Sequence, residues 1–395
     1  MQERKSAYRA HVDKVLLPFW LDRGVDAATG LFHERLDFSG APLAAAPRRL
    51  MVQARQIYVF ADAARVSRDA QAAKIVERAV ANLLRCYLDA GDASRGFAFS
   101  VSADGRILSE QRDAYGHAFV LFALAAAHRL LGDPALLAVA RRTLEFVEQR
   151  LFDPADGGMF DVYPNDGALK RQNPLMHLLE AFLALHETDA SGVWLDYATR
   201  VVSLFRTHLY KGDCRALPEY FAPGWSLPAD PARAFFEPGH HFEWVWLLGW
   251  HEALGGESHG ELRAALWRSA CDRGLSPQRL CYDAVALVGA PLKRSTRLWP
   301  HGEGVKAAAL LATAGDDEAA AVGRDMYRGL FDVFLSRPFA QGWIDHIGED
   351  GAPLVDFVPA SSLYHLYCAR AEPEWMTRAQ AARSAPTSVN RETAN

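Results

Sequence analysis

The sequence lacks the patterns of membrane proteins, secreted proteins and zinc ribbons. No uninterrupted apolar run approaches the roughly 18 residues that a membrane span needs. The N-terminal stretch MQERKSAYRAHVDKVLLPFW is charged and amphipathic and has no long apolar core, so it is not a signal peptide. The five cysteines are scattered, odd in number and never spaced Cys-x-x-Cys. We therefore expect a cytoplasmic protein with reduced thiols and no membrane contact.

Basic clusters and nucleotide-binding signatures are absent as well. The formal net charge is -5 and no block is dense in Lys or Arg, which predicts no nucleic-acid partner. The chain has no phosphate loop and no Gly-x-Gly-x-x-Gly fingerprint between a strand and a helix. What remains is an ordinary globular composition, with 50% hydrophobic and 23% charged residues.

An internal repeat is present instead. A Gly- or Pro-marked turn, a large apolar residue and often an Asp-Gly turn recur at Phe32, Phe97, Met159, Tyr220, Tyr282 and Trp343. Successive markers are 65, 62, 61, 62 and 61 residues apart. Short alternating segments closed by Asp-Gly are typical of small β-hairpins.

Helical segments fill the intervals between these markers. Residues 71–91 and 115–133 are rich in alanine and leucine and have helical periodicity. Two helices and one hairpin fit each interval, so six units predict an all-α fold, an (α/α)6 barrel of six helical hairpins with short β-hairpins between the repeats. An open helical solenoid is the alternative. We expect one domain over residues 1–371 and a polar, partly disordered tail over 372–395.

The stretch PGHHFEWVWLL (residues 238–248) raises three interpretations. His-Glu-x-x-His spacing is absent, which argues against a zinc site, although distant histidines leave that alternative open. His240 and Glu243 share one helical face, where a carboxylate can orient an imidazole and tune it near neutrality. His241 points away, and we expect it to be a buried structural residue.

Polar groups also gather at the other predicted helix starts. They are Arg55 and Tyr58; Tyr115 and His117; Asn173, His177 and Glu180; Arg297, Trp299 and Glu303; Tyr364 and His365. A single histidine in an apolar helix is more often a core residue, but closure of the ring would bring all these sets to one cavity. Tryptophans nearby suit stacking on a sugar ring. Glutamates are also common in these segments, so a glycosidase with two catalytic carboxyl groups stays an alternative. The equal number of histidines instead favours an enzyme that transfers protons.

Together these motifs resemble the N-acylglucosamine 2-epimerase superfamily. The matching segments are ARQIYVFADA, YGHAFVLFALA, NPLMHLLEAFLAL, EPGHHFEWVWLL, RLWPHGEGVKAAA and DFVPASSLYHLYCA, between about residues 50 and 370. The resemblance implies an α/α barrel that isomerises or epimerises a small sugar without a metal or other cofactor.

The resemblance also implies roles for individual residues. His240 and His365 match the two acid–base histidines, and His177 matches a third that holds the reducing end of the sugar. Arg55 matches the arginine on substrate oxygens, and Glu243 the carboxylate partnered with His240. Residues expected to line the pocket are Tyr115, His117, Asn173, Glu219, Trp299, Glu303 and Trp343. One departure, His301-Gly302, suggests an altered pocket wall.

These residues predict chemistry through a cis-enediolate. A histidine removes the C2 proton of an open aldose; its return to C1 gives a ketose, and its return to the other face of C2 gives the 2-epimer. We favour D-mannose–D-fructose isomerisation, with 2-epimerisation of an N-acylhexosamine, mannose or a disaccharide as the alternative. A glycosidase and a non-catalytic sugar-binding protein are weaker alternatives. A homodimer stays open, as does the identity of the histidine that removes the proton.

Overall fold

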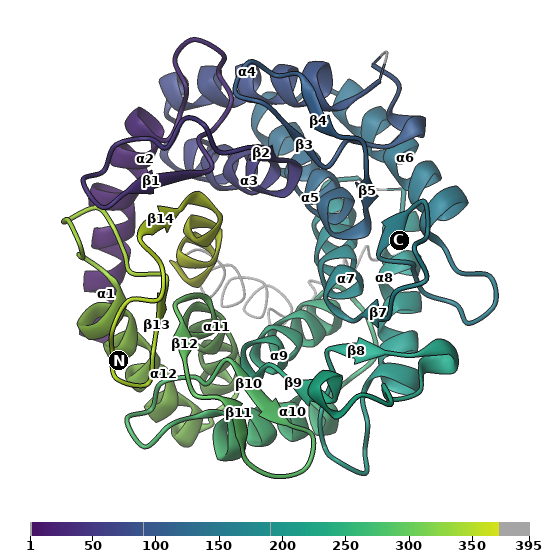
Figure 1. Ribbon diagram of the computed structural model, residues 1–395, viewed down its shortest axis with the longest axis vertical. Helices are drawn as coiled ribbons and strands as arrows, with labels where there is room; N and C mark the ends of the chain where they lie inside the picture. Colours follow the sequence, from purple (N-terminus) through teal and green to yellow (C-terminus); the bar gives the residue numbers. More distant parts are fainter. Residues whose placement is uncertain (1, 90, 190, 371–395) are drawn as a thin grey trace, which may run out of the picture.

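The computed structural model describes residues 2–89, 91–189 and 191–370. The tail predicted to be disordered, 372–395, lies outside these residues. The described chain forms a ring of helices in two layers (Figure 1). The prediction of a mostly helical protein is confirmed.

The inner and outer layers alternate along the chain. The inner layer contains α3 (Leu50–Ser67), α5 (Ala114–Leu131), α7 (Asn173–His186), α9 (Pro238–Ala253), α11 (Trp299–Thr313) and the helical residues 363–370. The outer layer contains α1 (Gln2–His11), α2 (Leu17–Arg23), α4 (Ala70–Tyr87), α6 (Ala135–Phe146), α8 (Val193–Leu204), α10 (Gly260–Gly274) and α12 (Asp317–Gly329). From α3 to α12, each inner helix packs against the outer helix that follows it and against the neighbouring inner helices.

Burial explains why the two layers differ in composition. Inner helices such as α9 are buried along nearly their whole length, so they are apolar on all sides. Outer helices such as α4 bury one face and begin at a capping aspartate, Asp69, which accepts hydrogen bonds from the Gln71 and Ala72 amides. Within the described residues, one helix, α5, is long and apolar enough to cross a membrane. It is an inner helix with 72% of that window buried, so packing accounts for its apolar sequence.

The outer helices share a further feature that continues the repeat. Four π-helical turns extend α1, α6, α8 and α12, at Val12–Leu16, Val147–Leu151, Phe205–Leu209 and Leu330–Phe334. The first and last residue of every turn are buried. A β-bridge then opens each hairpin, as between Leu335 and Trp343. Two of the six sequence markers are out of register, because the equivalent bridges end at Ala216 and Cys281 rather than at Tyr220 and Tyr282.

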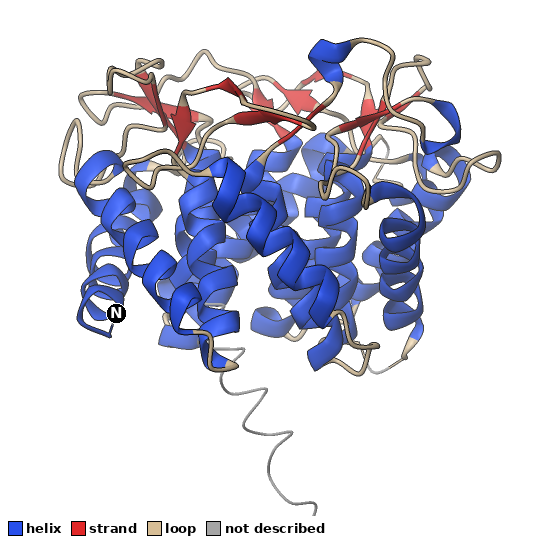
Figure 2. Cartoon of the chain, turned by 90° about the horizontal axis from the view of Figure 1, so that it is seen from below, coloured by secondary structure: helices blue, strands red, loops and turns tan. Residues whose placement is uncertain are grey.

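All the strands lie at one end of the ring (Figure 2). The small antiparallel sheets are β1 (Arg35–Asp37) with β14 (Phe357–Pro359), β2 (Arg48–Arg49) with β3 (Ser100–Val101) and β4 (Ile107–Ser109), β5 (Arg112–Asp113) with β6 (Val162–Tyr163), β7 (Lys170–Arg171) with β8 (Tyr220–Phe221), β9 (Phe235–Phe236) with β10 (Ala284–Ala286) and β11 (Pro291–Lys293), and β12 (Thr296–Arg297) with β13 (His346–Ile347). Five of these strands lead into inner helices, so the helix N-termini converge at the strand-bearing end.

The two ends of the described chain meet. β1 pairs with β14, and the Tyr8 hydroxyl donates to the Leu366 carbonyl at 2.9 Å. The Gln56 amide of α3 donates to the Ala360 carbonyl at 2.7 Å. These contacts join the first elements of the chain, among them α1 and α3, to the segment 357–366 at its end, which an open solenoid would not do.

Candidate active site

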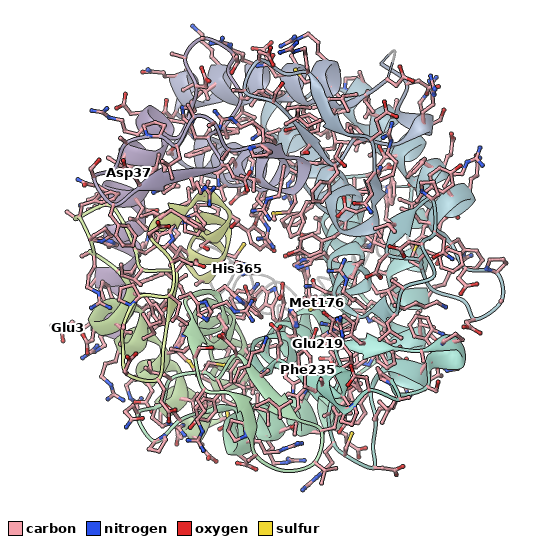
Figure 3. All side chains as sticks on the ribbon, viewed as in Figure 1. Glu3, Asp37, Met176, Glu219, Phe235 and His365 are labelled. Atoms are coloured by element: carbon pink, nitrogen blue, oxygen red, sulfur yellow. The ribbon has the colours of Figure 1, made fainter. Side chains whose placement is uncertain are left out.

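A cavity of about 280 Å³ opens among the N-terminal turns of the inner helices. Its lining residues are Arg55, Tyr115, Arg171, Asn173, His177, Glu219, Tyr220, Glu237, His240, Glu243, Arg297, Trp299, Asp345, Ser361, Ser362 and His365. Figure 3 shows His365 and Glu219 near the axis of the ring, whereas Glu3 and Asp37 lie at its outer edge. Nearly all the lining side chains are polar, so the cavity suits a small hydroxylated molecule.

His240 is held by a carboxylate from the neighbouring hairpin. Its Nδ1 lies 2.8 Å from Glu219 Oε1. The Glu237 amide and the Gln172 side chain also donate to Glu219, which fixes the orientation of its carboxylate. Burial disfavours a charged imidazole, but the negative charge of Glu219 and its hydrogen bond raise the pKa of His240 above its ordinary value. The imidazolium form of His240 is therefore favoured more than that of an ordinary histidine, and in that form it can donate a proton.

The pKa of His365 is shifted in the opposite direction. Its Nδ1 lies 2.7 Å from Glu303 Oε1, and Lys306 Nζ lies 2.7 Å from Glu303 Oε2. Lys306 and the hydrogen bond from His365 outweigh burial and lower the pKa of Glu303 to about 2. Burial lowers the pKa of His365 to about 3, and the positive charge of Arg55 adds to that effect. Because the carboxylate only accepts, Nδ1 carries the hydrogen and Nε2 keeps a lone pair.

Trp299 lies beside both histidines. Its ring centroid is 4.9 Å from that of His240 and 5.4 Å from that of His365. A Cβ at position 239 would come within 2.6 Å of this indole, so Gly239 allows α9 and α11 to approach closely enough for the contact. The indole thus forms a flat apolar wall in an otherwise polar cavity.

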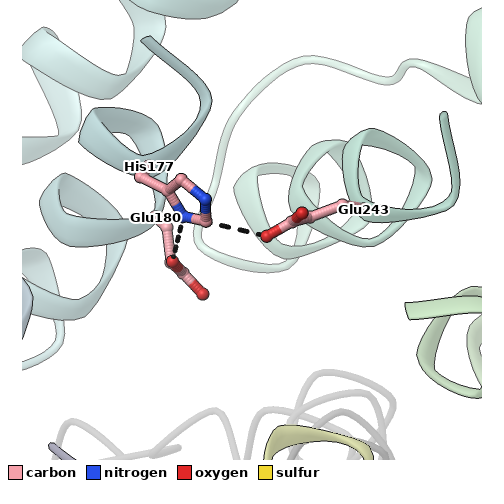
Figure 4. A group of neighbouring side chains, drawn as sticks. All are labelled: His177, Glu180 and Glu243. Atoms are coloured by element: carbon pink, nitrogen blue, oxygen red, sulfur yellow. Dashed lines mark hydrogen bonds and ion pairs between the residues drawn. The ribbon is translucent and has the colours of Figure 1, made fainter. Parts of the chain in front are cut away.

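A second polar cluster consists of His177, Glu180 and Glu243, which are all buried (Figure 4). His177 Nδ1 is 2.9 Å from Glu180 Oε2 and 3.8 Å from Glu243 Oε1, and the Tyr364 hydroxyl donates to Glu180. One donor atom from each of His177, Glu180 and Glu243 falls within 4.8 Å of the others, a spacing that a metal ion could bridge.

Burial shifts all three groups of this cluster towards their neutral forms. It raises the pKa of Glu180 to about 7, raises that of Glu243 well above its ordinary value, and lowers that of His177. Neither carboxyl oxygen of Glu243 has a hydrogen-bond partner within the described residues, although the side chain lines the cavity. Glu243 thus presents to the cavity a carboxyl group whose protonated form is favoured by burial.

Arg55 supplies a fixed positive charge at the cavity edge. Its Nη2 donates to the Tyr115 hydroxyl at 2.7 Å. The guanidinium lies over the Phe119 and Tyr364 rings, 4.2 and 4.8 Å from their centroids. Held in this way, the guanidinium can stabilise a negative charge on a bound molecule without moving.

Three residues predicted in the pocket do not line it. His117 Nδ1 donates to the Asp113 carbonyl at 2.7 Å, and its Nε2 accepts from the Phe97 amide at 2.9 Å. Trp343 stacks on Trp20 at 4.9 Å, on the outer side of the ring. Glu303 lies behind His365 and is fully buried. For His117 the reason is helical phase, since Tyr115, two positions earlier on α5, faces the cavity.

The partner predicted for His240 is also wrong. Glu219 takes the place expected for Glu243, because Nδ1 of His240 points to the hairpin rather than along its own helix. Glu243 instead approaches His177. The structural interpretation of His241 is confirmed: its Nε2 accepts from the Leu217 amide at 3.0 Å, and its ring stacks on Phe236.

His301 does not alter the pocket wall either. Its Nε2 accepts from the Cys281 amide at 3.3 Å, and it is absent from the cavity lining. His117, His241 and His301 therefore do the same thing in three repeats: each holds the backbone of the preceding hairpin. In the first repeat Gln53 has this position, with its Oε1 accepting from the Phe32 amide at 2.8 Å.

Several lining residues were not singled out from the sequence: Arg171, Tyr220, Asp345, Ser361 and Ser362. A signal existed for Asp345, because an acid follows Trp343 by two residues just as Asp161 follows Met159. Arg171 had a signal as well. Like Arg297, it directly precedes an inner helix and pairs with an acid on the preceding hairpin.

Comparisons with known proteins agree with this geometry. The family profile described as N-acylglucosamine 2-epimerase (GlcNAc 2-epimerase) matches residues 30–369. A mannose-6-phosphate isomerase of Rhizobium meliloti is 30% identical over 89% of this chain and 92% of its own length. A D-mannose isomerase of Thermobifida fusca is 29% identical over 76% and 79%. The structure of cellobiose 2-epimerase from Bacillus thermoamylovorans superposes with a TM-score of 0.86 and 16% identity, covering 96% and 100% of the two chains.

Proposed function

The chain belongs to the N-acylglucosamine 2-epimerase family of sugar isomerases and 2-epimerases, and from that premise we propose that it interconverts D-mannose, or a related free aldose, and D-fructose. One observation carries the proposal. Two buried histidines whose pKa values are shifted in opposite directions, His240 and His365, face a single small cavity beside Trp299. One is thus suited to donate a proton and the other to accept one.

The proposed reaction starts with the open form of the aldose. His365 Nε2 takes the proton from C2 while the C1 carbonyl oxygen becomes an enediolate oxygen. Arg55 stabilises that negative charge, and the His240 imidazolium moves protons between O1 and O2. Return of the proton from His365 to C1 gives the ketose. His177, Glu243 and Asn173 hold the reducing end, with Tyr115 and Glu219 supporting the arginine and the acid.

Epimerisation at C2 is the second candidate function, because the same residues serve it. If a group on the opposite face returns the proton to C2, the product is the 2-epimer. Both outcomes share the enediolate, and they differ only in the carbon and the face that are reprotonated.

The charges around the cavity favour a neutral sugar over a sugar phosphate. Arg171 pairs with Asp161, and Arg297 pairs with Asp283 and Glu237 at 2.9 Å each. The rim arginines are therefore compensated by carboxylates, and a phosphate dianion would meet Glu237 and Asp345 in the same lining. One relative is named a mannose-6-phosphate isomerase, so both sugars belong in the assay.

We further infer a barrel of six helical hairpins in one domain over residues 1–371, with 363–370 and α1–α2 as the sixth hairpin. The ion pair of Arg370 with Asp13, at 2.7 and 2.8 Å, supports this pairing. We propose that the enzyme works in the cytoplasm with no metal and no other cofactor. A homodimer stays a prediction.

The test is incubation with mannose, and separately with mannose 6-phosphate, in heavy water, followed by NMR. Fructose with solvent deuterium at C1 is the expected product. Glucose without fructose would show that the enzyme is a 2-epimerase rather than an isomerase. Turnover of mannose 6-phosphate but not of mannose would contradict the proposal of a neutral substrate. Activity that EDTA abolishes and a metal restores would make the His177–Glu180–Glu243 cluster a metal site.

A further inference from the structure

A lysine with no surface exposure lies behind His365 in the core of the ring. Lys306 Nζ is 2.7 Å from Glu303 Oε2, and Glu303 Oε1 is 2.7 Å from His365 Nδ1. Lys306 and Glu303 both have 0% relative exposure, and His365 has 6% because it lines the cavity. These contacts run from a buried ammonium, through one carboxylate, to an imidazole that faces the cavity.

We propose that Lys306 is a positioning residue for the reaction: it keeps Glu303 ionised, so that Glu303 holds His365 with Nδ1–H inward and the Nε2 lone pair towards the substrate. This inference rests on the proposed function, because it assigns His365 the role of base. Lys306 touches no substrate and acts only through Glu303.

Burial makes the ion pair of Lys306 and Glu303 costly, so its presence behind a cavity histidine points to a role in positioning that histidine. Removing an ammonium and a carboxylate from water costs several kcal/mol for each ion, and well-packed apolar groups often replace such a pair without loss of stability. The Trp246 ring, whose centroid lies 5.7 Å from Nζ, adds a cation–π contact to the ion pair. The geometry that links Lys306 to the cavity is the shared carboxylate of Glu303, whose other oxygen holds His365.

The neighbouring carboxyls indicate what Glu303 would become without the lysine. Glu180 and Glu243, buried in the same core, both have a raised pKa. The charged or titratable groups that act on Glu303, Lys306 or His365 are Tyr8 from α1, Arg55 from α3, His177 and Glu180 from α7, and Glu243 from α9. Of these only Arg55 is a cation; it lines the cavity, and its Nη2 donates to the Tyr115 hydroxyl rather than to Glu303.

Loss of Lys306 would leave the charge of Glu303 uncompensated, as that of Glu219 is beside His240, and the Glu303–His365 pair would take up a proton more readily. Whether the proton between the two groups lies on Nδ1 or on the carboxylate, the added proton leaves a hydrogen on Nε2. His365 could then not accept the C2 proton.

The experiment is a double-mutant cycle of Lys306→Met, Glu303→Gln and the charge-balanced double variant. We expect Lys306→Met to lower kcat by about 10- to 100-fold with a nearly unchanged KM. The acidic limb of its pH profile should move to higher pH, because Glu303 must be ionised for activity. The double variant should be no slower than Glu303→Gln alone, since the lysine acts only through that carboxylate.

Lys170→Met is the matched control. Lys170 is the other buried lysine of the described residues, and it pairs with Asp153 and Asp156 away from the histidines. We expect the control to lower thermal stability with kcat and pH profile unchanged. The proposal is overturned if Lys306→Met keeps kcat within about twofold, if only stability falls, or if the double variant shows the product of the two single effects.

A readout without turnover separates this inference from the proposed function. In the ¹⁵N-histidine-labelled protein, the His365 ring should be the Nδ1–H tautomer, assigned by its loss in His365→Gln. In Lys306→Met, Nε2 of His365 should gain a hydrogen. An Nε2 that stays unprotonated would overturn the role of Lys306 whatever the enzyme turns over, whereas wild-type inactivity on every aldose would overturn the proposed function alone.

Discussion

His240–Glu219 and His365–Glu303 are both buried histidine–glutamate pairs with nearly equal hydrogen bonds, at 2.8 and 2.7 Å. Their imidazole pKa values are nevertheless shifted in opposite directions. Glu219 is contacted by an amide and a glutamine, so its charge is left to stabilise an imidazolium at His240. Glu303 is already compensated by Lys306, so burial dominates and His365 stays neutral. What lies behind the carboxylate decides whether the imidazole is the acid or the base.

The first prediction separates the two histidines by their half-reactions, and it has the largest expected effect. His365→Ala should lose both product formation and exchange of the C2 hydrogen with solvent, by at least about 1,000-fold. His240→Ala should lose product formation to a similar extent while C2 exchange persists at a reduced rate, because the base remains. NMR of C2-deuterated mannose in ordinary water measures both rates.

The reverse pattern, with exchange lost in His240→Ala and kept in His365→Ala, would exchange the two roles. Circular dichroism of both variants should match that of the wild type, since each side chain faces the cavity rather than the core.

The second prediction tests the two carboxylates and has an intermediate effect. Glu219→Gln removes the charge that raises the pKa of His240, so burial should bring that pKa down. His240 must be protonated to act as the acid, and the alkaline limb of the kcat profile should therefore move to lower pH. At pH 8 we expect a loss of about 10- to 100-fold.

Glu303→Gln serves as the matched comparison, because its carboxylate holds the base rather than the acid. Its kcat should fall over the whole pH range while the alkaline limb stays in place. Movement of the same limb in both variants would show that the two pairs are not distinct in protonation.

The third prediction has the smallest effect on catalysis and compares cavity histidines with structural ones. His117, His241 and His301 have pKa values of about 4, 3 and 4, lowered by burial from 6.5. Below pH 6.5 these histidines therefore bind protons in the unfolded chain while they stay neutral in the folded chain. The stability linked to these groups is present above pH 6.5 and is lost as the pH falls towards 4.

Replacing each of the three by glutamine should leave kcat at pH 7.5 unchanged within about threefold. Gln53 already accepts the equivalent amide hydrogen bond in the first repeat, so the substitution keeps that bond. Each replacement should reduce the loss of stability between pH 7 and 5 by roughly 2 kcal/mol. Denaturation midpoints at the two pH values provide the measurement, and parallel shifts in wild type and triple variant would contradict the account.

The sequence patterns predicted much of the fold and several residues of the candidate site. The marker spacing predicted paired helices with hairpins between them, because each repeat must bury the same apolar faces against its neighbours. Local composition also placed His240, His365, His177 and Arg55 at the starts of inner helices, and the ring brings them to one cavity. The direction in which a side chain points from its helix was harder to predict from the sequence. His117 was misplaced because two positions along a helix turn a side chain about 200° from the cavity.

Local order along the chain thus determined the repeat, the helices and the end of the ring at which polar groups gather. Only the tertiary structure decided which carboxylate meets which histidine. Glu219 reaches His240 from the hairpin 21 residues earlier, and Glu303 reaches His365 across 62 residues of sequence. The pKa of an imidazole depends on charges within a few ångströms and on exclusion of water, and both arise only when distant segments pack together. Glu219 and Glu303 are chemically alike in the sequence, but in the folded chain Glu219 pairs with the proposed acid, His240, and Glu303 pairs with the proposed base, His365.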